Sequence, residues 1–281
     1  MDNKNLILVP TDFSEVCDNA IIYGAELAKI LGFDLCILHI IDKKTKAVLK
    51  KENAGMIEIA VKLDNIAKAT SKKYGIGVKS IAEEGDIFTG IGKIAAKLKV
   101  NLMILGTHGK VGLTQKFGMS FAKKVIATVP VPVIVVHEAA SIGKGFKNII
   151  FPVSTTAEVR QKVKWSILIA KTFKSTIHLF QLNQNAEEDK KIMQNYLRQI
   201  TKEFDKENIK YTHATADKKI SFAKQVQDYA HEVNADLITV MINLDVLNFK
   251  FGPYDEKIMF NPYEIPVMCI NPVKTKFEYW K

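Results

Sequence analysis

The chain has 281 residues, of which 47% are hydrophobic and 25% charged, and its formal net charge is +10. No apolar run approaches the about 18 residues that cross a bilayer, and the first residues lack a secretory pattern, which predicts a cytoplasmic protein without membrane contact. The three cysteines lie far apart within apolar segments, which argues against a disulfide framework and against a metal site.

The positive charge does not indicate a nucleic-acid-binding protein. Lysines are scattered in pairs, such as Lys72 and Lys73, usually with acidic residues nearby, and arginine is almost absent. Arginine reads bases best, and no alternation of aromatic and basic residues is present. We interpret the charge as a solvated basic surface and expect no nucleic-acid partner.

In the first half, short runs rich in Val, Ile and Leu alternate with longer stretches whose apolar residues recur every three to four positions. The short runs are typical of buried strands and the longer ones of helices. Strands that are apolar on both faces and separated by helices predict a doubly wound α/β domain. The predicted strands are residues 6–9, 35–41, 77–82, 102–105 and 131–136, and the predicted helices are residues 15–31, 54–74, 87–99 and 118–128.

Three residues mark helix ends. Ser14 is placed to cap the first helix, and Gly32 is placed to end it. Asp86 is placed to cap the helix that follows the third strand.

The pattern then begins again. The segment IIFP at residues 149–152 repeats the pattern of ILVP at residues 7–10, 142 positions later. IHLF at residues 177–180 repeats that of LCIL at residues 35–38 at the same interval. Matched features at a constant interval indicate a tandem duplication. We predict two domains, residues 1–138 and 147–273.

A glycine-containing stretch, GTHGKVGLTQKFGMS, spans residues 106–120 and follows the predicted strand at residues 102–105. Glycines between a strand and a helix can present backbone N–H groups to an anion. They are also the ordinary way to turn a chain. The pattern leaves both interpretations open.

Four segments in this order resemble the universal stress protein family. They are Val9-Pro10-Thr11-Asp12, Leu38-His39-Ile40-Ile41-Asp42, Gly106-Thr107-His108-Gly109 with Ser120, and Val129-Pro130-Val131-Pro132-Val133. The resemblance covers the whole first half, and the second half matches only in its framework. It implies a site for ATP or another adenine nucleotide, with Mg²⁺, built on a glycine motif. The implied binding residues are Pro10, Thr11, Asp12, Ile40, Gly106, His108, Gly109, Gly118 and Ser120.

The third glycine of the family motif is missing at its expected place. Met119 stands there, and a glycine stands one position earlier, at Gly118. Methionine brings a Cβ and a thioether to a position where glycine lets the backbone approach phosphate. Either the loop shifts by one residue so that Gly118 serves, or Met119 narrows the phosphate pocket.

The second half departs further from the motif. Met241 begins the segment that replaces the paired glycines, Pro253 lacks an N–H, and Ser154 stands where Asp12 stood. We predict that this half does not bind ATP in the family's manner. It is expected to pack against the first half and to be available for another ligand or partner.

No catalytic residue is predicted. His108 lies in the loop, but no second titratable group stands at a spacing that would orient it, and neither a Walker lysine nor a serine nucleophile elbow is present. His39 is interpreted as a buried, hydrogen-bonded residue at a strand end. Any ATP hydrolysis is expected to be slow.

The resemblance implies that the last strand of each domain pairs antiparallel with its counterpart. Residues 131–136 and 265–270 suit this role, because they are apolar and would be an aggregation hazard if left unpaired. We predict two tandem doubly wound, Rossmann-like domains with parallel five-stranded sheets, packed as an internal pseudo-dimer. Further association into a homodimer is left open.

Three functions remain open at this point. The first is a stress-response protein whose N-terminal domain binds an adenine nucleotide as a sensor or regulator. The second is a nucleotide-free interaction protein whose pocket Met119 blocks. The third is a weak adenosine-phosphate hydrolase that uses His108 and Ser120.

Overall fold

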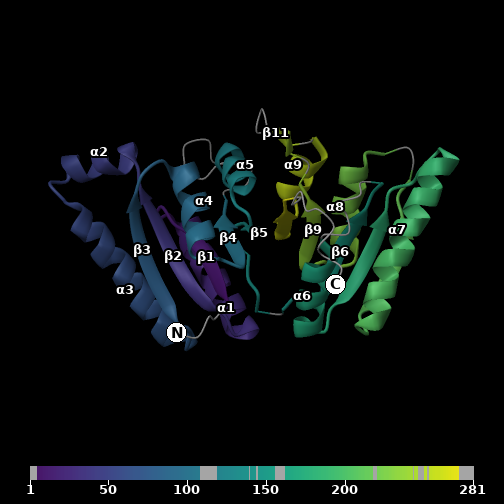
Figure 1. The fold of residues 1–281 in the computed structure, drawn as a ribbon, viewed down its shortest axis with the longest axis horizontal. Coiled ribbons are helices and arrows are strands. Elements are labelled where there is room, and N and C mark those ends of the chain that lie inside the picture. The colour runs from purple at the N-terminus through teal and green to yellow at the C-terminus, as the bar shows by residue number, and fades with distance from the viewer. Residues whose placement is uncertain are drawn as a thin grey trace.

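The structure, a computed structural model, describes residues 5–107, 119–138, 140–143, 145–155, 162–217, 220–242, 244–245, 250–251 and 253–271. Strands and helices alternate along the chain (Figure 1). In the first half the elements are β1 (Leu6–Pro10), α1 (Glu15–Leu31), β2 (Asp34–Ile41), α2 (Lys43–Lys51), α3 (Met56–Tyr74), β3 (Val78–Glu84), α4 (Ile87–Lys97), β4 (Leu102–Gly106), α5 (Met119–Thr128) and β5 (Val133–Val136).

The second half repeats this order except that a single helix, α7 (Glu187–Lys206), replaces α2 and α3, and a hairpin is added before its last helix. Its elements are β6 (Asn148–Val153), α6 (Val163–Phe173), β7 (Thr176–Gln181), α7 (Glu187–Lys206), β8 (Lys210–Thr215), α8 (Phe222–Glu232), β9 (Leu237–Met241), β10 (Leu244–Asp245), β11 (Lys250–Phe251), α9 (Pro253–Met259) and β12 (Val267–Ile270).

Ten strands form one sheet in the order β3-β2-β1-β4-β5-β12-β9-β6-β7-β8. All pairs within each half are parallel. The halves meet where β5 pairs antiparallel with β12, and Ile134 lies opposite Met268. This confirms the predicted tandem five-stranded sheets and their internal pseudo-dimer. The exact domain limits, residues 1–138 and 147–273, stay a prediction.

The two halves share details of strand register. Ile7 pairs with Leu35 in the first half, and Ile149 pairs with Ile177 in the second. The Leu6 amide donates to Asn101 Oδ1 at 2.9 Å, and the Asn148 amide donates to Asp236 Oδ2 at the same distance. A side chain just before β4 or β9 thus fixes the start of β1 or β6, which supports the duplication.

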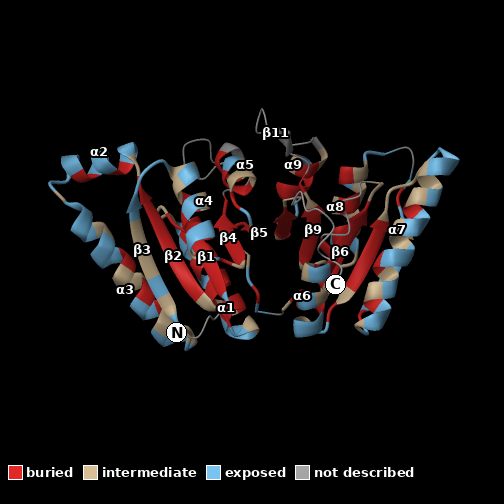
Figure 2. Ribbon diagram, in the orientation of Figure 1, coloured by how far each residue is buried: buried red, intermediate tan, exposed pale blue. Residues whose placement is uncertain are grey.

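Helices cover both faces of the sheet, and the strands at its centre are buried (Figures 1 and 2). One apolar cluster lies on the side of α4, α5, α8 and α9, and the other on the side of α1, α3, α6 and α7. Alternate residues of β5 enter each cluster, because successive strand side chains point to opposite faces. Both clusters therefore continue from one half into the other. Cys17, Cys36 and Cys269 are buried free thiols, as predicted.

Two elements were not predicted from the sequence. α2 has five lysines among its nine residues, and only Thr45 and Leu49 are buried, so it shows almost no apolar stripe. β10 and β11 form a hairpin of only two residues in each strand. Within the described ranges, no helix combines the length and apolar character needed to span a membrane.

Two of the three predicted helix ends are confirmed in full. Gly32 has a left-handed backbone (φ 70) after α1, and Asp86 Oδ1 accepts the amides of Phe88 and Thr89 at the start of α4. Ser14 is the N-terminal cap residue of α1, but its side chain makes no capping hydrogen bond. The neighbouring Asp12 carboxylate instead accepts the Ser14 amide at 3.0 Å.

His137 makes the junction between the halves sensitive to pH. It follows β5 and is buried, and burial lowers the pKa of its imidazole below 6.5, although the nearby Glu264 carboxylate opposes the shift. Below pH 6.5 the unfolded chain binds a proton that the folded chain resists, so stability should fall as the pH drops. In urea unfolding, the free energy of unfolding should decrease less between pH 7.5 and pH 5.5 in His137→Gln than in the wild type. An equal loss in both proteins would contradict this assignment.

Candidate functional site

The candidate site lies at the carboxyl edge of the first half's sheet, where the strand order reverses. β1 pairs with β2 over its full length, but it pairs with β4 only at Ile7–Leu102 and Leu8–Met103. β1 and β4 therefore separate before they reach Pro10 and Gly106. In open α/β sheets such a crevice is the usual place for a ligand.

The loop after β1 is held by hydrogen bonds to the neighbouring strand. Pro10 and Thr11 are buried, and the Thr11 amide donates to Leu38 O at 2.8 Å. His39 Nδ1 donates to Thr11 O at 2.8 Å, because a carbonyl can only accept, and this bond fixes the ring tautomer. His39 is thus the buried strand-end residue that the sequence predicts.

Asp12 stands at the open side of this loop. Its side chain is partly exposed, and Oδ1 accepts the Ser14 amide. Thr11 Oγ1 accepts the Phe13 amide at 2.9 Å. The hydrogen bonds of the loop leave the Asp12 carboxylate at the rim of the crevice, where a hydroxyl-bearing ligand could reach it.

Phe13 is a functional candidate that the sequence reasoning missed. Its backbone is left-handed (φ 66), which is an outlier for a bulky residue. Its ring stacks on His39 with centroids 4.7 Å apart, and Lys62 Nζ lies 4.2 Å from the ring centroid. Strained conformations of this kind concentrate at functional sites. No pattern in the sequence distinguishes this phenylalanine from a core residue.

Ile40 lies at the end of β2 and is buried. A Cβ added to Gly90 of α4 would lie 3.0 Å from Ile40 Cδ1, so the two residues are in close contact. The side chain of Ile40 therefore faces α4 rather than solvent. Its predicted part in an adenine slot stays a prediction.

Gly106 has a packing reason to be glycine. A Cβ there would lie 2.6 Å from Val16 O and 3.2 Å from Ala20 Cβ, so any larger residue would push α1 off the sheet. Gly106 also lies in the extended strand β4 and needs no left-handed backbone. Close packing of α1 on β4 thus explains the first of the two paired glycines, Gly106, without a ligand.

The rest of the predicted phosphate loop is only partly visible. His108, Gly109 and Gly118 lie outside the described residues, and of Met119 and Ser120 only the backbone is described, in the first turn of α5. A helical backbone suits any L residue, so the backbone at position 119 does not require glycine.

Four backbone amides at this edge are used inside the protein. Those of Thr11, Phe13, Ser14 and Thr107 all donate to protein acceptors. These four amides are therefore not available to an anionic ligand.

The second half has the same crevice, but a lysine fills it. β6 pairs with β9 only at Ile149–Leu237 and Ile150–Ile238. Lys162, which is 2% exposed, places Nζ between the two strands, where it donates to Thr239 O at 3.2 Å and to Pro152 O.

Two further interactions hold this buried ammonium group. Nζ lies 4.2 Å from the centroid of the Phe151 ring, and the buried Asp255 carboxylate acts on Lys162 through its charge. Acceptors and opposite charge are what a buried cation requires. This crevice is occupied by a side chain of the protein itself.

Four aromatic rings from β7, α8 and α9 stack on one another in the second half. Phe180 stacks on Tyr229 with centroids 4.7 Å apart and on Phe222 at 5.8 Å, and Phe222 stacks on Tyr254 at 5.4 Å. In the repeated sequence Tyr254 takes the place of Ser120. This aromatic column supports the prediction that the second half does not bind ATP in the family's manner.

The substitution Gly106→Ala tests the packing reason for this glycine. We expect a loss of about 1 to 3 kcal/mol in unfolding free energy without any ligand, because the new methyl group overlaps Val16 O. Gly143→Ala is the matched control, since its nearest neighbour, Ser141 Oγ, would lie at 3.4 Å. Equal losses in urea titrations of both variants would show that Gly106 is not packed as described.

The crevice lysine gives a second test. Burial lowers the pKa of Lys162 to about 7 from 10.5, although Asp255 opposes the shift. Between these values the unfolded chain binds a proton that the folded chain does not, so stability should rise with pH, by up to about 1.4 kcal/mol per unit. Lys162→Met should remove this rise. If the difference in unfolding free energy between the wild type and Lys162→Met stays the same from pH 7 to pH 9.5, the assignment is wrong.

The first half is similar in sequence to known proteins. A model of the "Universal stress protein family" matches residues 5–137. Universal stress protein MJ0577 of Methanocaldococcus jannaschii is 29% identical over an alignment of 156 residues that covers 48% of this chain and 96% of that protein. Universal stress protein Sll1654 of Synechocystis sp. is 31% identical over 132 residues, which are 46% of this chain and 83% of that protein.

The similarity of fold extends over both halves. A crystal structure of a universal stress protein from Archaeoglobus fulgidus matches 96% of this chain and 99% of that chain, with a TM-score of 0.76 and 17% identity. At this identity the match shows the fold alone. Sequence similarity in the first half and the repeated five-stranded framework lead to one conclusion: the chain belongs to the universal stress protein family.

Proposed function

We propose that the protein is a cytoplasmic sensor or regulator that binds an adenine nucleotide, ATP or AMP, in its first half. The observation that carries the proposal is the difference between the two crevices. Lys162 fills the crevice of the second half, and the residue 142 positions earlier is Ala20, whose methyl side chain does not reach between β1 and β4 as Lys162 reaches between β6 and β9. Membership of the universal stress protein family supports the same site.

The chemistry of the rim suits a nucleoside. In this proposal Pro10, Thr11 and Asp12 form the nucleoside side, and the Asp12 carboxylate accepts a ribose hydroxyl. The phosphates lie toward Gly106, His108, Gly109, Gly118 and Ser120, where Lys110 and Lys116 add positive charge. Mg²⁺ would accompany the triphosphate, and no catalytic residue is assigned.

One observation favours a nucleotide-free interaction protein instead. Ile40 is only 4% exposed and packs on Gly90, so it offers little surface to an adenine ring. Met119 adds a long side chain where the family motif has glycine. In this second candidate the protein acts through partners, without a ligand.

Mass spectrometry after gentle purification and denaturation distinguishes the two functions. We expect released ATP, ADP or AMP, and we expect millimolar ATP to raise the melting temperature, because a ligand that binds only the folded state stabilises it. The nucleotide proposal fails if no nucleotide is released and the melting temperature does not move.

Two substitutions then locate the ligand. Asp12→Asn keeps an oxygen that can accept the Ser14 amide but removes the charge, so ATP affinity should fall about tenfold with unchanged stability. An unaltered ATP affinity in Asp12→Asn, measured by calorimetry, would place the ligand elsewhere.

Met119→Gly should tighten ATP binding if the methionine side chain narrows the phosphate pocket.

A further inference from the structure

The end of α2 and the start of α3, at the outer end of the first half (Figures 1 and 2), carry exposed apolar side chains. Val48 on α2 is 50% exposed, and Met56, Ile57 and Val61 on α3 are 47%, 72% and 53% exposed. Single exposed apolar side chains are normal in soluble proteins. Ile57 and Val61 lie one helical turn apart and line one groove. We call these four residues the apolar patch, since gathered exposed apolar side chains mark interaction sites.

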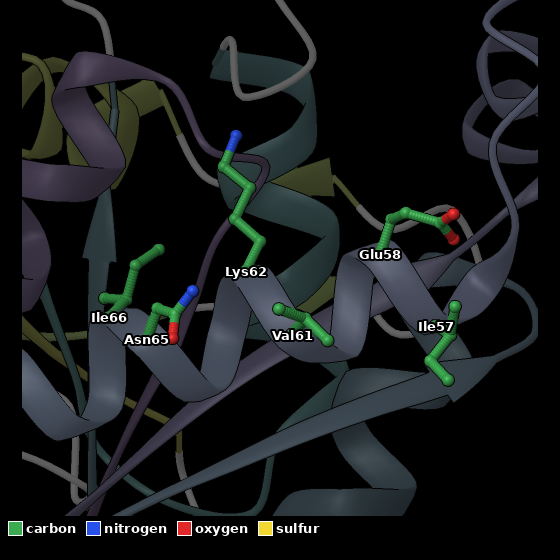
Figure 3. A pocket seen from close by; sticks show the side chains of 6 residues that line it. All are labelled: Ile57, Glu58, Val61, Lys62, Asn65 and Ile66. Atoms are coloured by element: carbon green, nitrogen blue, oxygen red, sulfur yellow. The ribbon is translucent and has the colours of Figure 1, made fainter.

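The patch includes a groove of about 420 Å³ on the outer face of α3 (Figure 3). Two rows of side chains spaced four residues apart line it: Ile57, Val61 and Asn65 in one row, and Glu58, Lys62 and Ile66 in the next. Such rows are the ridges of a helix, and the groove between them accepts a ridge of a second helix. The shape therefore suits a helical partner.

The second half shows that the fold does not require this apolar surface. α7 connects β7 to β8 as α3 connects β2 to β3, yet its first turn consists of Glu187, Glu188 and Asp189. No large apolar side chain of α7 is exposed. The apolar face of α3 is thus a property of the first half alone, although both helices occupy the same place in the duplicated architecture.

The charge around the patch is mostly positive, although Glu58 also lines the groove. Within α2 there are five lysines and no acidic residue, and all five are exposed. Lys46 forms an ion pair with Glu84 on β3. Lys50 and Lys51 lie in the last turn of α2, next to the start of α3, so they border the apolar patch. A partner seated on the patch would gain from negative charge on this side.

We propose that the outer face of α3, with the last turn of α2, docks an amphipathic helix of another protein that carries an acidic flank. Apolar residues of that helix cover Ile57 and Val61, and its acidic residues face Lys50 and Lys51. A second copy of this chain seated on the patch would bring its own Lys50 and Lys51 close to these lysines, and the like charges would repel it. The ridged groove matches a helix rather than the smooth surface of a bilayer.

The test uses a synthetic helical peptide with leucines spaced three and four apart and a glutamate flank. The full chain should bind it, with an affinity that falls as salt rises, in fluorescence anisotropy. Ile57→Asp combined with Val61→Asp should weaken binding at least tenfold. Ile220→Asp is the matched control, because this residue is 52% exposed in the second half, and it should leave binding unchanged.

A charge exchange makes the test specific. Lys44→Glu, Lys50→Glu and Lys51→Glu together should abolish binding of the glutamate peptide and create binding of the same peptide with lysines in the flank. The proposal is overturned if the glutamate peptide does not bind at millimolar concentration, or if the Asp pair on α3 leaves binding intact. Self-association at this face in sedimentation, or binding to anionic vesicles that the Asp pair abolishes, would overturn it equally by identifying another occupant.

Discussion

The antiparallel pairing of β5 with β12 is the interaction on which the whole molecule depends. Every residue of both strands is buried, and each strand would otherwise be an apolar edge. Side chains reinforce the junction: Lys123 of α5 pairs with Glu256 of α9, and Asn271 Nδ2 donates to Val129 O at 3.0 Å. Because the edges meet within one chain, the two halves form a single ten-stranded sheet.

Within that shared framework, the two halves differ in the residues that occupy the equivalent crevice. Both place a strand separation at the point where the strand order reverses, since the β1–β4 and β6–β9 pairs match in register. In the first half this crevice is bordered by backbone and by Asp12. In the second half it holds the Lys162 ammonium group. The two halves thus differ at this crevice: Lys162 fills that of the second half, and the proposed function places an anionic ligand in that of the first half.

The alternation of apolar runs was enough to predict the strands and the tandem repeat, because burial on both faces dictates residue type along a whole strand. The junction was predicted from the resemblance to the universal stress protein family. α2 escaped prediction because its helix is mostly exposed and lysine-rich. The candidate site was harder to predict from the sequence, because its geometry depends on contacts of single residues. The sequence cannot reveal that α1 packing already demands glycine at position 106, that Phe13 adopts a left-handed backbone, or that Lys162 reaches between two strands.

The central claim, that the crevice of the first half binds a nucleotide whereas Lys162 fills that of the second half, is tested most directly by photo-crosslinking with 8-azido-ATP followed by peptide mapping. The account predicts labelled peptides only from the first half, around residues 10–14 and 106–120, with labelling suppressed by excess ATP. Labelling of peptides around Lys162 or Tyr254, also suppressed by ATP, would contradict it.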